Sequence, residues 1–332
     1  MICHINLAKS FRGGERQTAL LINALSMEQK AILRRGSPLK AHIQKAKVQE
    51  ISKPFWLHLP SLKSCHLIHA HEAKGAQLAF LAHLLYGTPY VVTRRVLFDI
   101  KQNPFTQAIY AKAAAIIAIS NAVAEQVRHQ TKAKNIHIVP SALTPLATTK
   151  ELSKLQERFK DRFVVLNIAA LKESDKGQLD ILQTAKEMPD VTFVLVGTGP
   201  DEAMLKSKAP SNVIFEGFRS NIADYLAIAD IFLFPSRTEG LGSILLDAMA
   251  AGRPIITRPV GGIVDLVDES CALFAHTPKQ IVEAIKKLRH DPSLAKRLGQ
   301  EAKRRASKYK IERLTPTIER IYQRILDENL AH

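Results

Sequence analysis

A carboxylate and two closely spaced glycines follow a short apolar stretch in the second half of the chain. Residues 231–243 read Ile-Phe-Leu-Phe-Pro-Ser-Arg-Thr-Glu-Gly-Leu-Gly-Ser, so that Glu239 directly precedes Gly240 and Gly242. We expect residues 231–234 to form a buried strand and the glycines to open a helix. Backbone N–H groups at a helix start, together with the helix dipole, favour an anion such as phosphate. The segment therefore predicts a binding site for a diphosphate.

A second carboxylate, Asp247, lies eight residues after Glu239. This spacing is slightly more than two helical turns, so two side chains that face one ligand would reach opposite ends of it. Carboxylates that accept hydrogen bonds from sugar hydroxyls suit this spacing. The alternative is that Glu239 is a capping acid of the first turn and Asp247 a solvated helix residue. The next predicted strand, 255–257, is followed by another glycine turn at 261–262, so two successive strand ends carry glycines.

The segment from Pro235 to Gly262 resembles the nucleotide-sugar site of the retaining family 4 glycosyltransferases. The signature of that family is Glu-x7-Glu within E-G-x-G…E-A-M-A-x-G-x-P…G-G, and Asp247 replaces its second glutamate. The resemblance implies the α/β fold called GT-B, with two Rossmann-like domains facing across a cleft. It further implies that the second domain binds a nucleotide-diphospho-sugar, that the first binds the acceptor, and that no metal or cofactor takes part.

Two segments of the first half resemble other parts of the same family. Gly13-Gly14-Glu-Arg is only a turn by itself, but it resembles the loop that lies beneath the transferred sugar. The segment His69-Ala-His71-Glu72 resembles a strand end at which the last histidine and the acid face the interdomain cleft. Strand alternation puts His69 and His71 on one face, as a metal pair would require. We expect no metal there, because no third ligand of suitable spacing follows.

Two arginines, Arg94 and Arg95, follow the predicted strand 89–93. Ligands of open α/β sheets bind at the carboxyl ends of strands. Many family members have a sugar-contacting histidine near this position, and its absence suggests that the arginines hold a phosphate or an acidic acceptor.

A lysine, Lys176, precedes a glycine between a predicted strand at 163–168 and a helix at 178–188. It is either a solvated side chain or a partner of the diphosphate, and the resemblance favours the second interpretation. Ala170 stands where the family has an arginine, so Lys172, Arg237 or the first domain would supply the missing charge. We predict catalytic roles for Glu239, Lys176, His71 and Arg94, and donor binding by Gly13, Gly14, Lys176, Gly199, Phe218, Arg237, Glu239, Gly240, Leu241, Gly242, Ser243 and Asp247.

The length of 332 residues suits two domains, each with its own core. We expect them at 1–145 and 150–310, with a terminal helix at 311–332 that packs back on the first domain. The three cysteines are far apart and show no CxxC spacing, which suggests neither a disulfide framework nor a zinc site and suits the cytoplasm. Residues 1–7 are predicted to be a strand rather than a signal peptide, and no apolar run reaches the roughly 18 residues of a membrane span.

The positive charge is concentrated in the first half of the chain. Residues 1–150 hold 20 Lys and Arg against 6 Asp and Glu, whereas the remainder holds 27 against 25. The first half therefore either presents a solvated basic surface or meets an anionic partner, such as a membrane surface or an acidic glycolipid. Nucleic acid is not expected, because no RNP, KH or helix-turn-helix signal is present. The aromatic cluster 54–57 lies within a basic segment, 30–63, and belongs either to the core or to a membrane-docking surface.

We therefore expect a cytoplasmic enzyme, peripheral on the inner face of the membrane, that transfers a sugar with retention to an anionic glycolipid. The segments at 69–72 and 93–95 further resemble bacterial enzymes that extend the core of lipopolysaccharide or lipooligosaccharide. The alternatives are a glycosyltransferase with another polysaccharide or lipid acceptor and a nucleotide-sugar epimerase of GT-B type.

Overall fold

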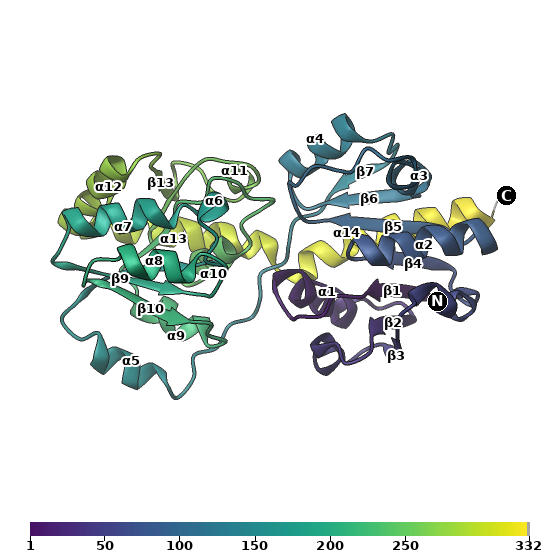
Figure 1. Ribbon diagram of the computed structural model, residues 1–332, viewed down its shortest axis with the longest axis horizontal. Coiled ribbons are helices and arrows are strands. Elements are labelled where there is room, and N and C mark those ends of the chain that lie inside the picture. Colours follow the sequence, from purple (N-terminus) through teal and green to yellow (C-terminus); the bar gives the residue numbers. More distant parts are fainter. Residues whose placement is uncertain (331–332) are drawn as a thin grey trace. The chain divides into compact units, whose positions relative to one another are not determined.

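The computed structural model describes residues 1–330, which divide into two compact units (Figure 1). The first unit comprises Met1–Ala142 together with the segment that begins at Tyr309, and the second comprises Leu143–Lys308. Each unit contains one sheet in which all strand pairs are parallel. The predicted α/β class with two Rossmann-like halves is therefore confirmed.

The sheet of the first unit has seven strands in the order β3-β2-β1-β4-β5-β6-β7. The order reverses between β1 and β4, and ligands of open α/β sheets bind outside the carboxyl ends of strands at such a point. Its strands are β1 (Ile2–Asn6), β2 (Gln29–Arg34), β3 (Lys47–Ile51), β4 (Leu67–Ala70), β5 (Tyr90–Arg94), β6 (Ala115–Ala118) and β7 (Ile136–Ile138). The connecting elements are α1 (Gly13–Ala24), η1 (Pro38–His42), η2 (Phe55–Leu62), α2 (Ala73–Tyr86), α3 (Pro104–Lys112) and α4 (Asn121–Gln130).

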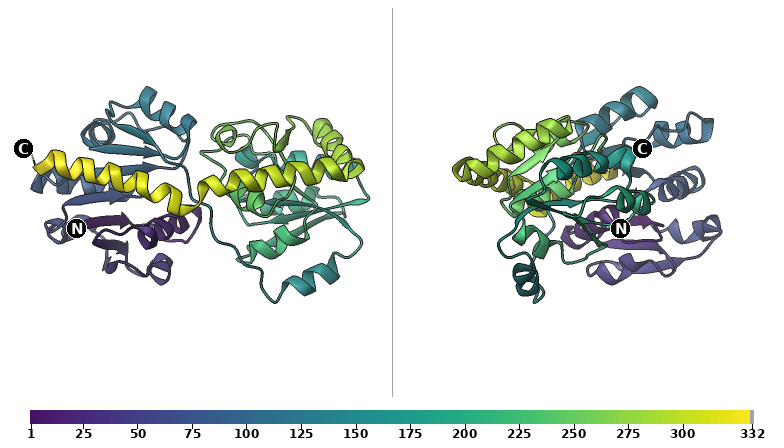
Figure 2. Two further views of the ribbon diagram at one scale, coloured as in Figure 1. Left: turned by 180° about the vertical axis from the view of Figure 1, so that it is seen from behind. Right: turned by 60° about the vertical axis from the view of Figure 1, so that its left-hand side comes forward.

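The last helix of the chain, α14 (Ile311–Leu330), lies across the sheet of the first unit (Figure 2). Its apolar side chains recur at helical spacing and join one core cluster with residues of β1, β4, β5 and α1. Tyr322 is fully buried there, between Ile318 and Ile325 along the same helix face. This packing places α14 against the first strand and the first helix. The last two positions of the predicted helix 311–332 lie outside the described residues.

The sheet of the second unit has six strands in the order β10-β9-β8-β11-β12-β13, and its order reverses between β8 and β11. Its strands are β8 (Phe163–Ile168), β9 (Val191–Val196), β10 (Val213–Gly217), β11 (Ile231–Phe234), β12 (Ile255–Thr257) and β13 (Ala272–Phe274). Its helices are α5 (Leu152–Arg158), α6 (Glu173–Lys176), α7 (Gln178–Glu187), α8 (Glu202–Lys208), α9 (Ile222–Ile228), α10 (Ile244–Ala250), α11 (Ile263–Leu266), α12 (Pro278–His290) and α13 (Pro292–Ala306).

The prediction about the cysteines is wrong, because Cys3 and Cys65 form a disulfide. They are 62 residues apart in sequence, but Cys3 lies in β1 and Cys65 stands just before the adjacent strand β4. The spacing of the cysteines along the sequence does not reveal this disulfide, because the pairing of β1 with β4 brings the two residues together. The argument from cysteines for a reducing compartment therefore loses its basis.

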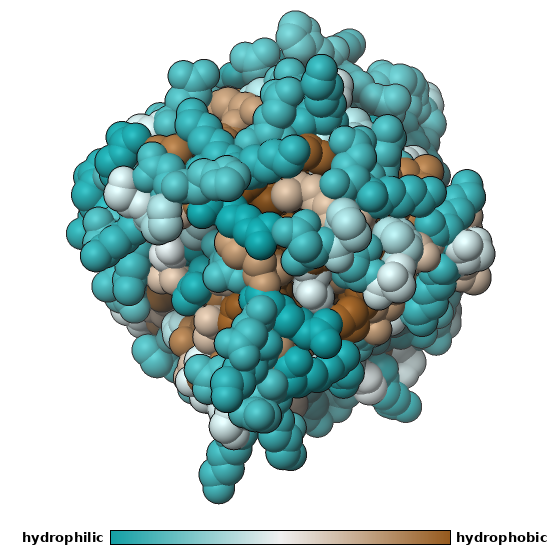
Figure 3. All heavy atoms as spheres, turned by 90° about the vertical axis from the view of Figure 1, so that its left-hand side faces the viewer, coloured by the Kyte–Doolittle hydropathy of each residue, from teal (hydrophilic) through white to brown (hydrophobic). Residues whose placement is uncertain are grey.

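The aromatic cluster at 54–57 is divided between core and surface. Phe55 packs partly buried against the core of the first unit, while Trp56 is 58% exposed and Leu57 57% exposed. No helix among the described residues is long and apolar enough to cross a membrane. Figure 3 shows the side of the second unit, which is mainly hydrophilic with small apolar areas between polar side chains.

Candidate active site

Lys176 and Glu239 meet at the carboxyl edge of the second sheet, where its strand order reverses. Lys176 is the last residue of α6, which follows β8, and Glu239 follows β11, the strand that pairs with β8. The ammonium of Lys176 forms an ion pair with the carboxylate of Glu239. Both side chains are largely shielded, with exposed fractions of 21% and 11%. The sequence predicted both residues for the site but did not predict that they pair.

The glycine after Lys176 allows this approach. Gly177 has a φ of +65°, and a Cβ added there would lie 2.5 Å from the carbonyl oxygen of Pro235. Only glycine adopts this conformation at so short a distance from another backbone. The amide of Arg237 also donates to the carbonyl of Asp175 at 2.8 Å. The α6–α7 turn is therefore held directly against the end of β11.

The other cations at this edge are already paired with carboxylates. Lys172 contacts Asp175 at 2.6 Å, and Arg237 contacts Glu173 at 2.5 Å. The carboxylate of Asp180 forms ion pairs with the guanidinium of Arg237, at 3.1 Å, and with that of the buried Arg258, at 2.6 Å. Lys172 and Arg237 are therefore paired with carboxylates, as Lys176 is, and a diphosphate would have to compete with those acids. That Lys172 or Arg237 supplies charge to the diphosphate stays a prediction.

The glycine segment 240–243 forms an irregular turn rather than the start of the helix. The helix α10 begins at Ile244, because Gly242 has a φ of +75° and Leu241 is buried beneath the turn. The amide of Gly262 donates to the carbonyl of Glu239 at 3.0 Å, so the two predicted glycine turns are in direct contact. Asp247 is only 5% exposed, which rules out the alternative of a solvated helix acid.

Gly199 and Phe218 follow β9 and β10 at the same edge of this sheet. A Cβ on Gly199 would lie 2.2 Å from the carbonyl oxygen of Leu171, so the glycine serves close packing of two strand ends. Phe218 is 71% exposed and presents a free aromatic face. An exposed ring of this kind can stack on a nucleotide base.

In the first unit, Gly13 and Gly14 are the first two residues of α1 rather than a loop before it. The carboxylate of Glu15 accepts from the amide of Arg12 at 2.9 Å and so caps the helix. A Cβ on Gly14 would lie 3.6 Å from Cδ of Arg95. The structure thus brings the glycine pair and the second arginine together at the carboxyl end of the first sheet.

His71 does not face solvent, because it belongs to a buried cluster with His4 and His69. Its Nε2 lies 3.0 Å from Nδ1 of His4, and only 4% of the residue is exposed. His69 is hydrogen-bonded to the hydroxyl of Tyr322 at 2.5 Å and to that of Thr93 at 2.6 Å. Glu72, the neighbouring acid, caps α2 by accepting from the amides of Lys74 and Gly75. His71 is therefore buried within the first unit, and the partly exposed Glu72 is engaged at the start of α2.

Burial lowers the pKa of His4 to about 4 and holds the pKa values of His69 and His71 well below the ordinary value. One nitrogen from each ring lies within 4.8 Å of the others, so that the three could ligate a transition metal. Both nitrogens of His69 already have hydroxyl partners, and the charge of Arg95 opposes a cation. These contacts favour a hydrogen-bonded network over a metal site. Sequence reasoning missed His4, and its strand register with His69 is the signal that would have found it.

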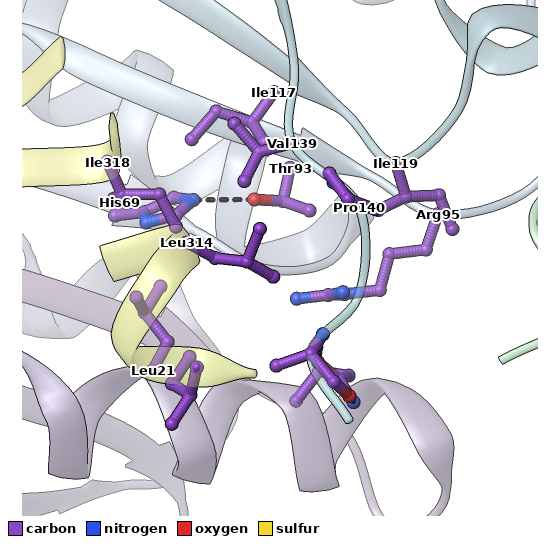
Figure 4. Close-up of a pocket in the computed structure, with 13 residues that line it drawn as sticks. Leu21, His69, Thr93, Arg95, Ile117, Ile119, Val139, Pro140, Leu314 and Ile318 are labelled. Carbon is purple, nitrogen blue, oxygen red and sulfur yellow. Dashed lines mark hydrogen bonds between the residues drawn. The ribbon is translucent and has the colours of Figure 1, made fainter. Parts of the chain in front are cut away.

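The two arginines after β5 have different environments. Arg94 donates to the carbonyl of Phe98 and so closes the loop that follows the strand. Arg95 reaches into a small cavity beneath α14 (Figure 4). Of the two predicted arginines, Arg94 therefore holds the loop after β5, and Arg95 is directed at the cavity.

Comparison with known proteins identifies two family models in this chain. Residues 148–305 match the model of glycosyl transferases group 1, and residues 33–144 match that of glycosyltransferase family 4. Together they cover most of both units.

Among curated proteins, the alpha-D-kanosaminyltransferase of Streptomyces kanamyceticus is 24% identical over 78% of this chain and 77% of its own length. The lipopolysaccharide core biosynthesis glycosyltransferase LpsD of Rhizobium meliloti is 30% identical over 42% of this chain and 43% of its own length. Among solved structures, that of Anabaena HepE in complex with UDP-glucose superposes with a TM-score of 0.86. The superposition covers 97% of this chain and 99% of HepE at 18% identity, which shows a shared fold.

Proposed function

Because this chain belongs to the glycosyltransferases of group 1 and family 4, we propose that it moves a sugar from a nucleotide-diphospho-sugar to a membrane-anchored acidic saccharide, with retention of anomeric configuration. The observation that carries the proposal is the pairing of Lys176 with Glu239 at the reversal point of the second sheet. A cation and a carboxylate at one strand edge match the two ends of a sugar-diphosphate.

Departure of the nucleoside diphosphate is the difficult step of such a transfer. Negative charge grows on the leaving phosphate, and Lys176 would stabilise it, more strongly because water is largely excluded from this side chain. Glu239 would then release the lysine and accept a hydrogen bond from a sugar hydroxyl. The amide of Gly262 donates to the carbonyl of Glu239, which holds the backbone from which this side chain would turn to the sugar. We assign no general base.

Several other residues would bind the donor or position other groups without taking part in the departure of the leaving group. The turn 240–243 would offer backbone amides to the diphosphate, Asp247 would contact the ribose and Phe218 the base. His71 and Arg94 act as positioning residues, because both are held by contacts within the first unit. Gly13 and Gly14 would lie beneath the transferred sugar.

The proposed acceptor is an anionic saccharide on a membrane, with lipopolysaccharide core as the leading candidate. The support is the excess of basic residues in 1–150, and the similarity to LpsD. Exposed Trp56 and Leu57 in a basic segment would dock the first unit on an anionic surface at the inner face of the membrane. Each nearby Lys or Arg contributes about 1 kcal/mol to such docking.

The test has two parts. Incubation with UDP-, GDP- and ADP-sugars, with and without an acidic glycolipid, should consume donor and yield a glycoside only when acceptor is present. Donor conversion to an isomeric nucleotide-sugar without acceptor would instead identify an epimerase. Sedimentation with anionic liposomes at rising salt should show binding that weakens with ionic strength. Binding that ignores both lipid charge and salt would exclude the docking proposal.

A further inference from the structure

A small cavity lies within the first unit, between the carboxyl ends of β4, β5 and β6 and the helices α1 and α14 (Figure 4). Its volume is about 30 Å³. Apolar side chains such as Leu21, Leu314 and Ile318 form its walls on the helix side, and Thr93 and His69 contribute polar groups on the sheet side. The cavity therefore admits a small polar group rather than a whole sugar ring.

Arg95 is the charged group of this cavity and has no partner of its own. Its Nε is buried without a hydrogen-bond acceptor, and no ion pair or hydrogen bond of its guanidinium occurs within residues 1–330. Burial lowers the pKa of Arg95 to about 10, which still leaves it positive at neutral pH. Glu15, the carboxylate whose charge opposes this effect, is already engaged by the amide of Arg12.

Two shielded arginines of the second unit do have partners. Arg258, which is 8% exposed, contacts Asp180 and two backbone carbonyls, and Arg253 donates to the carbonyl of Ala229. Arg94, the immediate neighbour, donates to Phe98. Arg95 is only partly shielded from solvent, with a buried Nε. Partial desolvation of a cation without an anion still has a cost, so an unpaired arginine beside a cavity indicates that a ligand supplies the missing charge.

We propose that Arg95 binds one carboxylate or phosphate group of the acceptor in this cavity, an inference that rests on the proposed function and names its recognition element. A guanidinium offers two parallel N–H donors to either group. Thr93 is fixed by its bond to His69, and its hydroxyl lines the same space. The first turn of α1 lies beside this side chain, because a Cβ on Gly14 would be in van der Waals contact with Cδ of Arg95. Arg95 thus selects acidic acceptors over neutral ones.

Binding of sodium formate and of inorganic phosphate to the full chain tests the site directly. Thermal-shift titrations at constant ionic strength, balanced with chloride, should show saturable stabilisation of the unmodified protein by at least one of these anions. Arg95→Gln should weaken that binding about tenfold or more, and Arg95→Lys should retain part of it. Lys134→Gln removes the same charge from an exposed position and should bind as the unmodified protein does.

Acceptors then distinguish the two chemical sources of the anion. Transfer rates should be compared for three acceptors: a glucuronide, a phosphorylated glucoside and a neutral glucoside. One of the two acidic acceptors should react fastest, and its anionic group, carboxylate or phosphate, is the one that Arg95 binds. Arg95→Gln should abolish the preference for the acidic acceptor while donor binding, measured separately, is unchanged. The proposal is overturned if Arg95→Gln binds the anions as well as the unmodified protein, or if neither anion binds at all. The anion-binding measurements need no turnover, so their failure is distinct from absence of transferase activity.

Discussion

The ammonium of Lys176 and the carboxylate of Glu239 form an ion pair that joins the loops after two adjacent parallel strands, β8 and β11. The pair neutralises charge at a strand edge where the other cations are matched by acids as well. A diphosphate that binds here would compete with Glu239 for the lysine. The two side chains should therefore affect donor affinity in opposite directions.

Replacement of Glu239 by Gln should separate turnover from donor binding. We expect turnover to fall by roughly 10²–10³-fold, the usual loss when one electrostatic contact to a transition state is removed. Donor affinity should be unchanged or higher, because Lys176 is released. Steady-state kinetics and calorimetric titration measure the two effects, and an unchanged melting temperature is the control. Turnover equal to that of the unmodified enzyme would exclude Glu239 from the reaction.

Lys176→Ala should weaken donor binding and turnover together. The substitution leaves the Glu239 carboxylate beside the diphosphate, so repulsion is added to the lost attraction. Hydrogen bonds to charged groups contribute about 1.5–3 kcal/mol, which corresponds to roughly tenfold or more in affinity. The double variant Lys176→Ala/Glu239→Gln should recover part of the donor affinity. If Lys176→Ala bound donor normally, the phosphate site would lie elsewhere.

The disulfide between Cys3 and Cys65 should stabilise the first unit measurably. It closes a segment of 62 residues, for which constraint of the unfolded chain predicts about 4 kcal/mol. Reduction should lower the free energy of unfolding by this order, while the Cys3→Ala/Cys65→Ala variant should not respond to reductant. Thiol titration of the unfolded, unreduced protein should detect Cys271 alone. Detection of all three thiols would contradict the disulfide.

The buried histidines predict a loss of stability in mild acid. His4, His69 and His71 are neutral in the folded state, because burial lowers their pKa values, that of His4 to about 4. In the unfolded chain each of these imidazoles has a pKa of about 6.5 and takes up a proton below that pH. The folded state does not bind these protons, so acid favours unfolding. Stability is therefore complete above pH 6.5 and falls toward pH 4, by up to about 1.4 kcal/mol per pH unit for each histidine.

Urea unfolding between pH 7.5 and 4.5 measures this slope. His4→Gln should give a shallower slope than the unmodified protein, and substitution of the exposed His129 should leave the slope unchanged. Identical slopes for all three proteins would show that the histidine cluster does not contribute.

The fold was predictable because its signals are local. Strand runs such as 231–234 and 163–168 are apolar and bounded by turn residues, and they appear where expected. The signature around Glu239 and the Lys176-Gly177 dipeptide likewise depend on spacing along the chain. Residue types at fixed offsets therefore sufficed for the fold class and for strands such as these.

Pairings between distant segments were not predictable. The disulfide, the contact of His4 with His71 and the bond of Tyr322 to His69 each join elements that are far apart in sequence. Arg94 and Arg95 are adjacent in sequence, and only the loop after β5 decides that one binds Phe98 and the other faces a cavity. Charge alone could not separate them.

The most direct test of the account is product analysis by NMR after incubation with the preferred nucleotide-sugar and an acidic glycoside. The account predicts a new glycoside with the anomeric configuration of the donor, formed only with acceptor present and lost in Glu239→Gln. A product of inverted configuration, or equal product formation by Glu239→Gln, would contradict it.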